Sequence, residues 1–174
     1  MNTPTRMLRI CRRWNGTPIE PADQISVAWT EQGSIIELQV AAPFYGDPPA
    51  PNAPIGPTDR LWEHEVVEVF IAGPDSRYTE IELAPSGHHL VLQLDGVRQP
   101  IAARIPIEFH AAVEGNRWLG VARIPRTVMP PKPWRVNATA IHGSHDRREY
   151  LSMHALPGTE PDFHQPDLFQ PLPD

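Results

Sequence analysis

The sequence predicts an all-β protein, an antiparallel β-sandwich of the jelly-roll type, on the basis of three observations. Short segments with an apolar residue at every second position recur along the chain. The three-to-four-residue spacing of amphipathic helices is scarce. Proline is abundant, at 22 of 174 residues, and the prolines fall between the apolar segments. Because proline is excluded from helix interiors and central strands, this arrangement favours many short strands joined by loops.

The chain is expected to form one domain over residues 1–174. Its length is typical of a single domain, and the sequence shows neither an internal repeat nor a shift in composition that would mark a boundary. The first predicted strands cover residues 24–30 and 34–42, with a turn at Gln32 and Gly33 between them. A long Pro-rich loop is predicted over residues 43–59. Loops of this length inside a compact domain are often functional.

The middle of the chain carries the clearest alternation. Strands are predicted over residues 66–72, 78–83 and 88–94, with a turn at Pro85-Ser86-Gly87 before the last of them. Their alternate apolar residues share one phase with a later segment that contains Val136. The residues predicted to form the core are Val67, Val69, Ile71, Ile81, Leu83, Val136 and Ala138.

The last part of the chain continues the same pattern. Strands are predicted over residues 107–113, 118–124, 134–141 and 149–153, and a helical turn is predicted near residues 125–129. Strands and turns at this spacing are typical of a sandwich or barrel.

Charge and hydropathy exclude several classes of partner. The net charge of −6 argues against nucleic acid, because a protein that binds phosphate backbones needs a basic face. No apolar run approaches the roughly 18 residues of a membrane span. The N-terminal segment lacks the apolar core of a signal peptide, and Cys11 is the single cysteine. A cytoplasmic protein is therefore expected.

The sequence offers little support for catalysis. Ser86 lies beside two histidines, but a hairpin turn explains it more simply than a catalytic serine, which needs an oriented base and acid. Glu65, Glu68, Glu80 and Glu82 lie on strands expected to be neighbours, and glycosidases use two carboxylates across a cleft. These glutamates are explained equally well as a solvated sheet face or as acceptors for a ligand. The protein is expected not to be an enzyme.

No metal motif or cofactor site is recognisable in the sequence. The eight histidines form neither HExxH nor a Cys/His finger, and no cofactor is expected. A composite metal site from His64, His142 and His164 remains open, because each of these residues borders a distinctive segment. A histidine in a polar cleft more often makes hydrogen bonds than binds an ion.

Three segments combine aromatic residues with polar residues that point away from the predicted core. They are WEHEVVEVF at residues 62–70, WRVNATAIHG at residues 134–143 and PDFHQPDLF at residues 161–169. Flat aromatic faces and a few fixed polar groups suit a sugar-like ligand, because its C–H face stacks on a ring while its hydroxyls need donors and acceptors.

These segments, together with YTEIELAPSGHHLVL at residues 78–92, resemble the DOMON-like superfamily that includes family 9 type carbohydrate-binding modules. The similarity is greatest to an intracellular branch of it and extends from Ser34 to the C-terminus. It implies a jelly-roll sandwich whose ligand lies between two tryptophans. Trp62 matches the first of these, Glu68 matches an acidic residue of the family, and Phe163 stands where the second tryptophan is expected.

The chain also departs from the family pattern. Glu82 falls where the sugar-binding modules have arginine, Ala84 where they have asparagine, and Thr139 where they have glutamine. These replacements change about half of the polar set. The resemblance therefore implies a ligand different from the family's sugar.

A non-catalytic module that binds a carbohydrate or similar small polar ligand is the function expected. Its predicted site is a shallow pocket formed by Trp62, Glu68, Glu82, Asn137, Thr139 and Phe163. A protein-interaction module that uses the same face and the Pro-rich loop is one alternative. A haem or metal carrier is another, because some DOMON domains hold haem through Met and His. Met153 and His154 are adjacent, however, and neighbouring residues of a strand face opposite ways.

Overall fold

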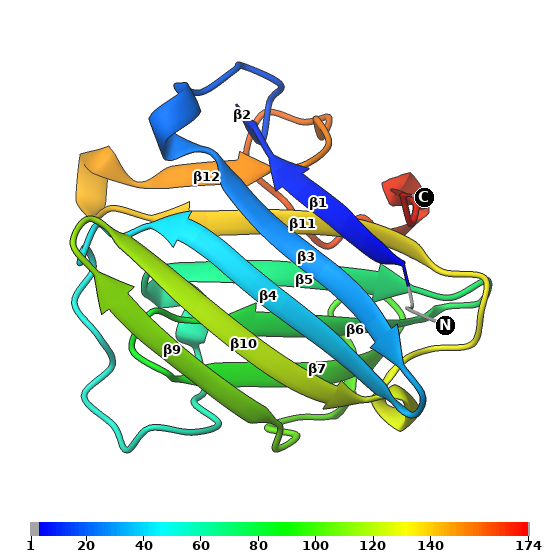
Figure 1. The fold of residues 1–174 in the computed structure, drawn as a ribbon. Coiled ribbons are helices and arrows are strands. Elements are labelled where there is room, and N and C mark those ends of the chain that lie inside the picture. Colours follow the sequence, from blue (N-terminus) through cyan, green and yellow to red (C-terminus); the bar gives the residue numbers. More distant parts are fainter. Residues whose placement is uncertain (1–3, 174) are drawn as a thin grey trace.

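The structure is a computed structural model that describes residues 4–173, and within this range two antiparallel sheets pack face to face (Figure 1). The first sheet has five strands, in the order β1-β3-β4-β10-β9. Its strands are β1 (Thr5–Ile10), β3 (Ile25–Gln32), β4 (Ile35–Pro43), β9 (Glu108–Glu114) and β10 (Arg117–Pro125). The predicted all-β sandwich is confirmed.

The second sheet has eight strands, and seven of them run in the order β2-β12-β11-β5-β6-β7-β8. The eighth strand, β13, pairs with β11 outside this order. Its strands are β2 (Arg12–Arg13), β5 (Val66–Ala72), β6 (Arg77–Leu83), β7 (His89–Asp95), β8 (Pro100–Ala102), β11 (Arg135–His142), β12 (Glu149–Ser152) and β13 (Gln170–Pro171).

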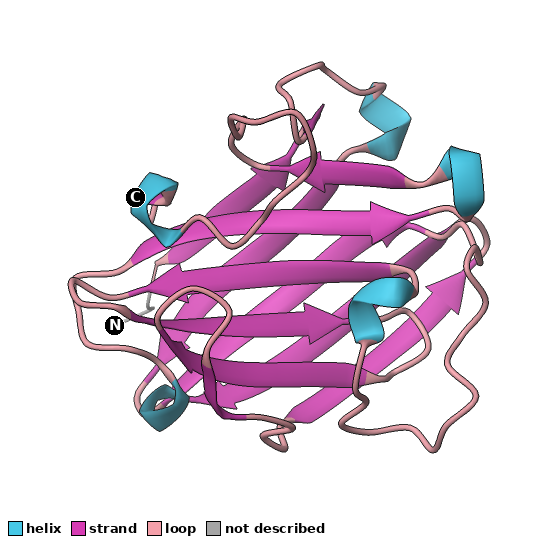
Figure 2. Cartoon of the chain, turned by 180° about the vertical axis from the view of Figure 1, so that it is seen from behind, coloured by secondary structure: helices cyan, strands magenta, loops and turns pink. Residues whose placement is uncertain are grey.

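Short 3-10 turns connect the strands at the ends of the sandwich (Figure 2). They are η1 (Pro21–Asp23), η2 (Leu61–Glu63), η3 (Arg126–Val128), η4 (His145–Arg147) and η5 (Pro166–Leu168). The helical turn predicted near residues 125–129 corresponds to η3. In the described part of the chain, no helix has the length and apolar character needed to cross a membrane.

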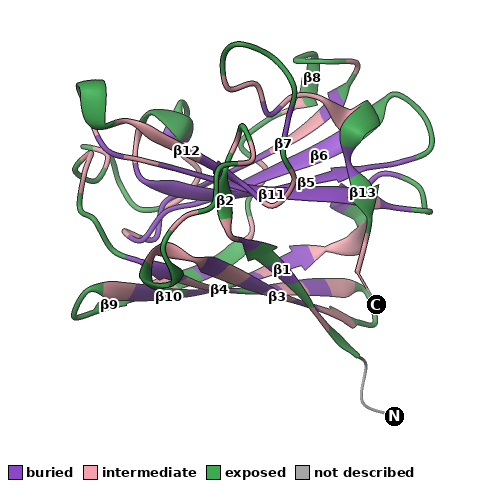
Figure 3. Cartoon of the chain, turned by 90° about the horizontal axis from the view of Figure 1, so that it is seen from above, coloured by how far each residue is buried: buried purple, intermediate pink, exposed green. Residues whose placement is uncertain are grey.

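The main core lies between the two sheets (Figure 3). All seven predicted core residues are buried there. The first sheet contributes Trp29, whose ring meets that of Trp134 edge-on at 5.7 Å between centroids. The period-2 alternation of β5, β6 and β11 therefore identified the inward face of the second sheet.

The outward face of the second sheet is also buried, which the sequence analysis did not foresee. A second apolar cluster covers it, formed by residues such as Phe70 and Leu90 together with loop residues such as Phe163. Glu68, Glu80 and Glu82 point to this face, and each is at most 3% exposed. The interpretation of these glutamates as a solvated sheet face is wrong, because loops and the C-terminal segment cover them.

Four short strands were missed by the sequence analysis: β1, β2, β8 and β13. β1 presents only Leu8 and Ile10 to the core, so its alternation is too short to detect. The other three strands have two or three residues each and depend on pairing with distant segments.

The Pro-rich loop over residues 43–59 is tied to the second sheet near the start of β5 and the end of β11. The Glu65 carboxylate accepts hydrogen bonds from the backbone N–H groups of Tyr45 at 3.0 Å and Gly46 at 2.7 Å. The Gly143 N–H donates to the Asp47 carbonyl at 2.7 Å. These contacts fix the first part of the loop beside η2, which carries Trp62.

Candidate functional site

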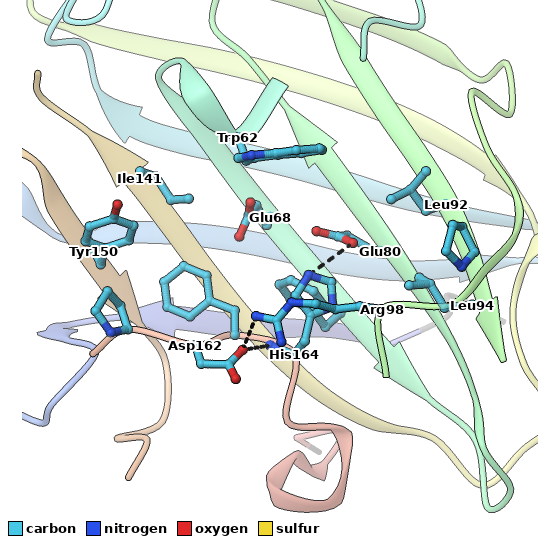
Figure 4. Close-up of a pocket in the computed structure, with 14 residues that line it drawn as sticks. Trp62, Glu68, Glu80, Leu92, Leu94, Arg98, Ile141, Tyr150, Asp162 and His164 are labelled. Carbon is cyan, nitrogen blue, oxygen red and sulfur yellow. Dashed lines mark hydrogen bonds and ion pairs between the residues drawn. The ribbon is translucent and has the colours of Figure 1, made fainter. Parts of the chain in front are cut away.

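A cavity of about 420 Å³ opens on the outward face of the second sheet (Figure 4). Cavities of this size are typical of sites for small ligands. Its apolar lining comes from Trp62, Phe70, Leu92, Leu94, Pro100, Ile141, Tyr150, Pro161 and Phe163, and its polar lining from Glu68, Glu80, Arg98, Asp162 and His164.

Aromatic side chains form the walls of the cavity. Trp62 on η2 lines the cavity and is 42% exposed. Tyr150 on β12 and Phe163 in the C-terminal segment line another part, with ring centroids 6.2 Å apart. Figure 4 shows the Trp62 indole on one side of the space into which Glu68 and Glu80 point. The exposed indole leaves a flat surface available to a ligand.

One arginine holds the turn that presents Trp62. The Arg148 guanidinium donates to the carbonyl oxygens of Trp62, Glu63 and Gly143. It also lies 5.8 Å from the centroid of the Tyr150 ring. Arg148 thus connects the η2 turn to the end of β11 and to the opposite aromatic wall.

Three carboxylates meet below the aromatic walls because of strand register. Glu68 on β5 pairs directly with Glu82 on β6, and Glu80 lies two residues along β6 on the same face. One oxygen from each carboxylate can be chosen so that all three lie within 4.8 Å of one another. The alternation of β5 and β6 therefore concentrates three acidic groups at one buried point.

Few protein groups satisfy these carboxylates. The Thr139 hydroxyl, across the β5–β11 pair, donates to Glu68 Oε2 at 2.6 Å. Within residues 4–173, no donor in hydrogen-bond geometry reaches either oxygen of Glu82, although the Trp62 backbone N–H is close enough to stabilise its charged form. Glu80 Oε2 also lacks a hydrogen bond, and His164 Nε2 lies 3.8 Å from it.

Burial and mutual repulsion raise the pKa values of all three glutamates. Burial raises the pKa of Glu68 to about 7, against the opposing effects of the Thr139 hydrogen bond and the charge of Arg148. The pKa of Glu80 is well above its ordinary value because of burial and then the charge of Glu68. Burial, followed by the charges of Glu68 and Glu80, does the same to Glu82. The cluster favours the uptake of protons or cations.

His164 is held as a neutral hydrogen-bonding group beside the cluster. Its Nδ1 lies 2.8 Å from the Tyr78 hydroxyl, and that hydroxyl oxygen accepts the Arg98 backbone N–H at 3.0 Å. The Tyr78 hydroxyl can donate to Nδ1, and in that tautomer the neutral His164 carries its proton on Nε2, facing Glu80. Burial and the charge of Arg98 lower the pKa of His164 to about 4.

An exposed ion pair forms the rim of the cavity. Arg98 Nη2 lies 2.7 Å from Asp162 Oδ1. Burial would raise the pKa of Asp162, but the Arg98 and His164 hydrogen bonds lower it below the ordinary value. Arg98 offers further N–H donors to a molecule in the cavity.

The predicted site residues divide into two groups. Trp62, Glu68 and Phe163 line the cavity. Glu82 and Thr139 are fully buried next to Glu68 and do not reach the cavity wall.

Asn137 lies farther along β11 and is occupied by other groups. Its Nδ2 donates to Ser152 Oγ at 3.1 Å, and it is fully buried. Of the predicted floor of Glu68, Glu82, Asn137 and Thr139, only Glu68 therefore lines the cavity.

The structure does not bring the three candidate metal-binding histidines together. His64 Nδ1 contacts the Pro49 carbonyl at 2.8 Å, and the His142 ring packs against Tyr45 at 3.8 Å between centroids. Only His164 lies at the cavity. Among the described residues, the group with metal-ligating spacing consists of Glu68, Glu80 and Glu82.

Comparison with known proteins places the chain among close relatives. No family model matches the sequence. The mouse UPF0462 protein C4orf33 homolog is 39% identical over 169 residues, which cover 91% of this chain and 86% of the relative. The human UPF0462 protein C4orf33 is 34% identical over 170 residues, covering 93% and 85%. This chain belongs to the UPF0462 family. The zebrafish relative is 35% identical over 90% of the chain and 83% of its own length.

A solved structure shares the fold of this UPF0462 member. It is a "putative carbohydrate-binding protein" from Bacteroides uniformis, with a TM-score of 0.69 and 18% sequence identity. The alignment covers 97% of this chain and 84% of that protein. The similarity establishes that the two proteins have the same sandwich architecture.

Several cavity residues of this UPF0462 member were not in the predicted site. Glu80 could have been found, because it shares the outward phase of Glu68 and Glu82 in the strand pattern. Asp162 lies in the segment PDFHQPDLF and could also have been found, whereas Arg98 and Tyr150 reach the cavity from a loop and a distant strand and carry no local signal.

Proposed function

We propose that this chain is a non-catalytic module that binds a small, neutral, polyhydroxylated ligand, a carbohydrate or a similar molecule, in the cavity beside Trp62. The observation that carries the proposal is the combination of an exposed indole with buried carboxylates in one 420 Å³ space. Such a ligand has an apolar face for the ring and hydroxyls for the carboxylates.

The polar lining suits hydroxyl groups better than a charged ligand. Glu68 and Glu80 accept hydrogen bonds when ionised and also donate when protonated, and a pKa near 7 makes both forms available to Glu68. Arg98 and His164 Nε2 can supply donors in the same cavity. A ligand with both donors and acceptors can satisfy this mixed set.

Two similarities support the proposal without extending to the ligand itself. Trp62, Glu68 and Phe163 occupy positions that resemble the ligand-contacting positions of family 9 type carbohydrate-binding modules. The protein that shares the fold is described as a "putative carbohydrate-binding protein". Both are consistent with a sugar-like ligand in the cavity.

The test is a titration of the full chain with neutral mono- and oligosaccharides and polyols, followed by tryptophan fluorescence and calorimetry. Trp62→Ala should weaken binding about five- to tenfold, because an aromatic contact contributes on the order of 1 kcal/mol beyond area burial. Phe44→Ala is the control, since Phe44 is similarly exposed but does not line this cavity. Equal binding by wild type and Trp62→Ala would contradict the proposal. An absence of sugar binding would favour a protein partner on this face.

One observation favours a catalytic alternative. Buried carboxylates with raised pKa values are typical of acid/base catalysts, and Glu68 reaches about 7. Chromatography of each oligosaccharide after prolonged incubation separates the two functions. Intact ligand is expected for a binding module, whereas cleaved products lost in Glu68→Gln would establish an enzyme.

A further inference from the structure

We propose that Glu68, Glu80 and Glu82 form a site for a hard divalent cation of the size of calcium. The proposal goes beyond sugar binding, because the ligands are the carboxylates themselves and no sugar is required. It rests on the geometry of the cluster, on the unsatisfied oxygens of Glu82 and on the access that the cavity provides.

The spacing of the carboxylates suits a calcium-sized ion. Calcium takes oxygen ligands at about 2.3–2.6 Å, so two oxygens on opposite sides of it are about 4.6–5.2 Å apart. Three oxygens within 4.8 Å of one another can therefore reach one such ion. Magnesium demands near-ideal octahedral geometry, whereas calcium accepts irregular and flexible oxygen coordination. Calcium is therefore the ion assigned to this cluster.

Glu82 provides the second, independent observation. Its side chain is fully buried and points into the cluster, and among residues 4–173 neither of its oxygens has a donor in hydrogen-bond geometry, although the Trp62 backbone N–H lies close enough to favour its charged form. Buried polar groups are hydrogen-bonded in the large majority of structures, so an unsatisfied carboxylate at this depth calls for a partner. A cation shared with Glu68 and Glu80 satisfies all three side chains together.

The protein itself does not supply the missing positive charge. Over the described part of the chain, neither Glu68 nor Glu82 has an ion-pair partner within 4 Å, and Glu80 has only His164 at 3.8 Å. The charges of Arg98 and Arg148 act on the cluster from farther away.

The cavity gives an ion access and further ligands. Glu68 and Glu80 line it, so an ion bound between the carboxylates can complete its shell of six to eight oxygens with water (Figure 4). A ligand set made only of carboxylate oxygens favours calcium over zinc or copper, which prefer nitrogen and sulfur. Trp62 lines the same cavity, which places an indole near the ion.

The experiment uses the full chain after treatment with a chelator, with calcium chloride as the probe. Calcium at about 100 times its Kd should raise the Tm by about 5–10 °C for a domain of this size. Terbium, which replaces calcium and is excited by nearby tryptophan, should give sensitised emission that calcium displaces. Both signals should be lost in Glu82→Gln and in Glu68→Gln.

Glu65→Gln is the matched control. Glu65 is also a buried glutamate, but the backbone N–H groups of Tyr45 and Gly46 satisfy it outside the cluster. The Glu65→Gln variant should keep the calcium-dependent rise in Tm, even if its Tm in the absence of calcium differs from that of wild type.

If a variant does not fold, the Tm and terbium emission of the wild-type protein alone test whether calcium binds. A Tm and terbium emission that do not respond to millimolar cation overturn the proposal, as does an unchanged calcium response in Glu82→Gln. A response to magnesium or manganese but not to calcium overturns the size assignment. Sugar binding is measured separately with the metal absent, so failure of one proposal is distinguishable from failure of the other.

Discussion

Glu68 on β5 and Glu82 on β6 are direct cross-strand partners, and both are buried. Like charges directly opposite in a sheet are destabilising, and burial increases the cost of each charge. The native arrangement therefore requires protons or a cation at this point. Stability should depend on which of these is present.

The pH dependence of stability should reveal the Glu68 proton. The pKa of Glu68 in the folded protein, about 7, exceeds the ordinary value of 4.5, so the folded state keeps a proton that the unfolded chain releases. This contribution is complete below about pH 4.5 and is lost as pH rises through about 7. For one group it is about 3 kcal/mol, and Glu80 and Glu82 act in the same direction.

The measurement compares urea denaturation of wild type and Glu68→Gln at pH 5 to 8 in the presence of chelator. The comparison is needed because His164, with its lowered pKa, has the opposite pH dependence below about pH 6.5. Relative to the variant, wild type should lose stability as pH rises. Parallel curves for the two proteins would mean that Glu68 is ionised throughout.

Leu90→Ala should cost about 2–5 kcal/mol, as for other buried leucine truncations. Leu90 is 2% exposed and belongs to the outward cluster, so its loss leaves a cavity beneath the covering loops. Chemical denaturation measures the change. Val121→Ala is the control, since Val121 is 40% exposed on the other sheet and should change stability by less than about 1 kcal/mol.

Gly143→Ala should be among the most damaging small substitutions. Gly143 has φ of 77°, and an added Cβ would lie 2.0 Å from the Arg147 carbonyl oxygen. A loss of more than about 3 kcal/mol is expected from this clash. Gly115→Ala separates the effect of the clash from the effect of the backbone conformation, because Gly115 has φ of 63° but open space around it. This substitution should cost only about 1–2 kcal/mol. Equal losses in thermal melts would show that backbone conformation alone matters.

Arg148→Lys should disturb the aromatic wall more than the fold. An ammonium cannot reproduce the planar set of donors with which Arg148 reaches the carbonyls of Trp62, Glu63 and Gly143. The anisotropy of Trp62 fluorescence should fall and ligand affinity should drop several-fold, with a Tm shift of a few degrees at most. Arg147→Lys serves for comparison, since Arg147 is 76% exposed and pairs with Asp47. Equal anisotropy and equal ligand affinity in the two variants would contradict a role of Arg148 in positioning Trp62.

The central strands of the second sheet could be predicted from the sequence, because the alternation of apolar and polar residues in β5, β6 and β11 is long and regular. The sequence also identified three residues that line the cavity. Trp62 and Phe163 were selected as aromatic residues beside the ends of strands, and Glu68 was selected as an outward-facing residue of a strand. The main core followed from the same alternation, as Val69 and Val136 illustrate.

The burial of the outward face could not be predicted in the same way. The segments that cover it lie far from β5 in sequence, as Tyr150 and Phe163 do, and no local pattern signals where they dock. Arg98 reaches the rim from the β7–β8 connection and carries no pattern of its own. Glu82 and Thr139 were assigned to the right face but to the wrong depth, because depth depends on these distant covers.

The burial of β5 and β6 on both faces has a consequence for the evolution of the sequence. Neighbouring positions on one strand serve separate compartments: Val69 packs between the sheets, while Glu68 faces the cavity. Substitutions at one set of alternate positions alter the packing between the sheets, and substitutions at the other set alter the lining of the cavity. Descendants of one ancestral sandwich can therefore acquire different cavity linings by exchanging every second residue of two strands while inheriting the same interior.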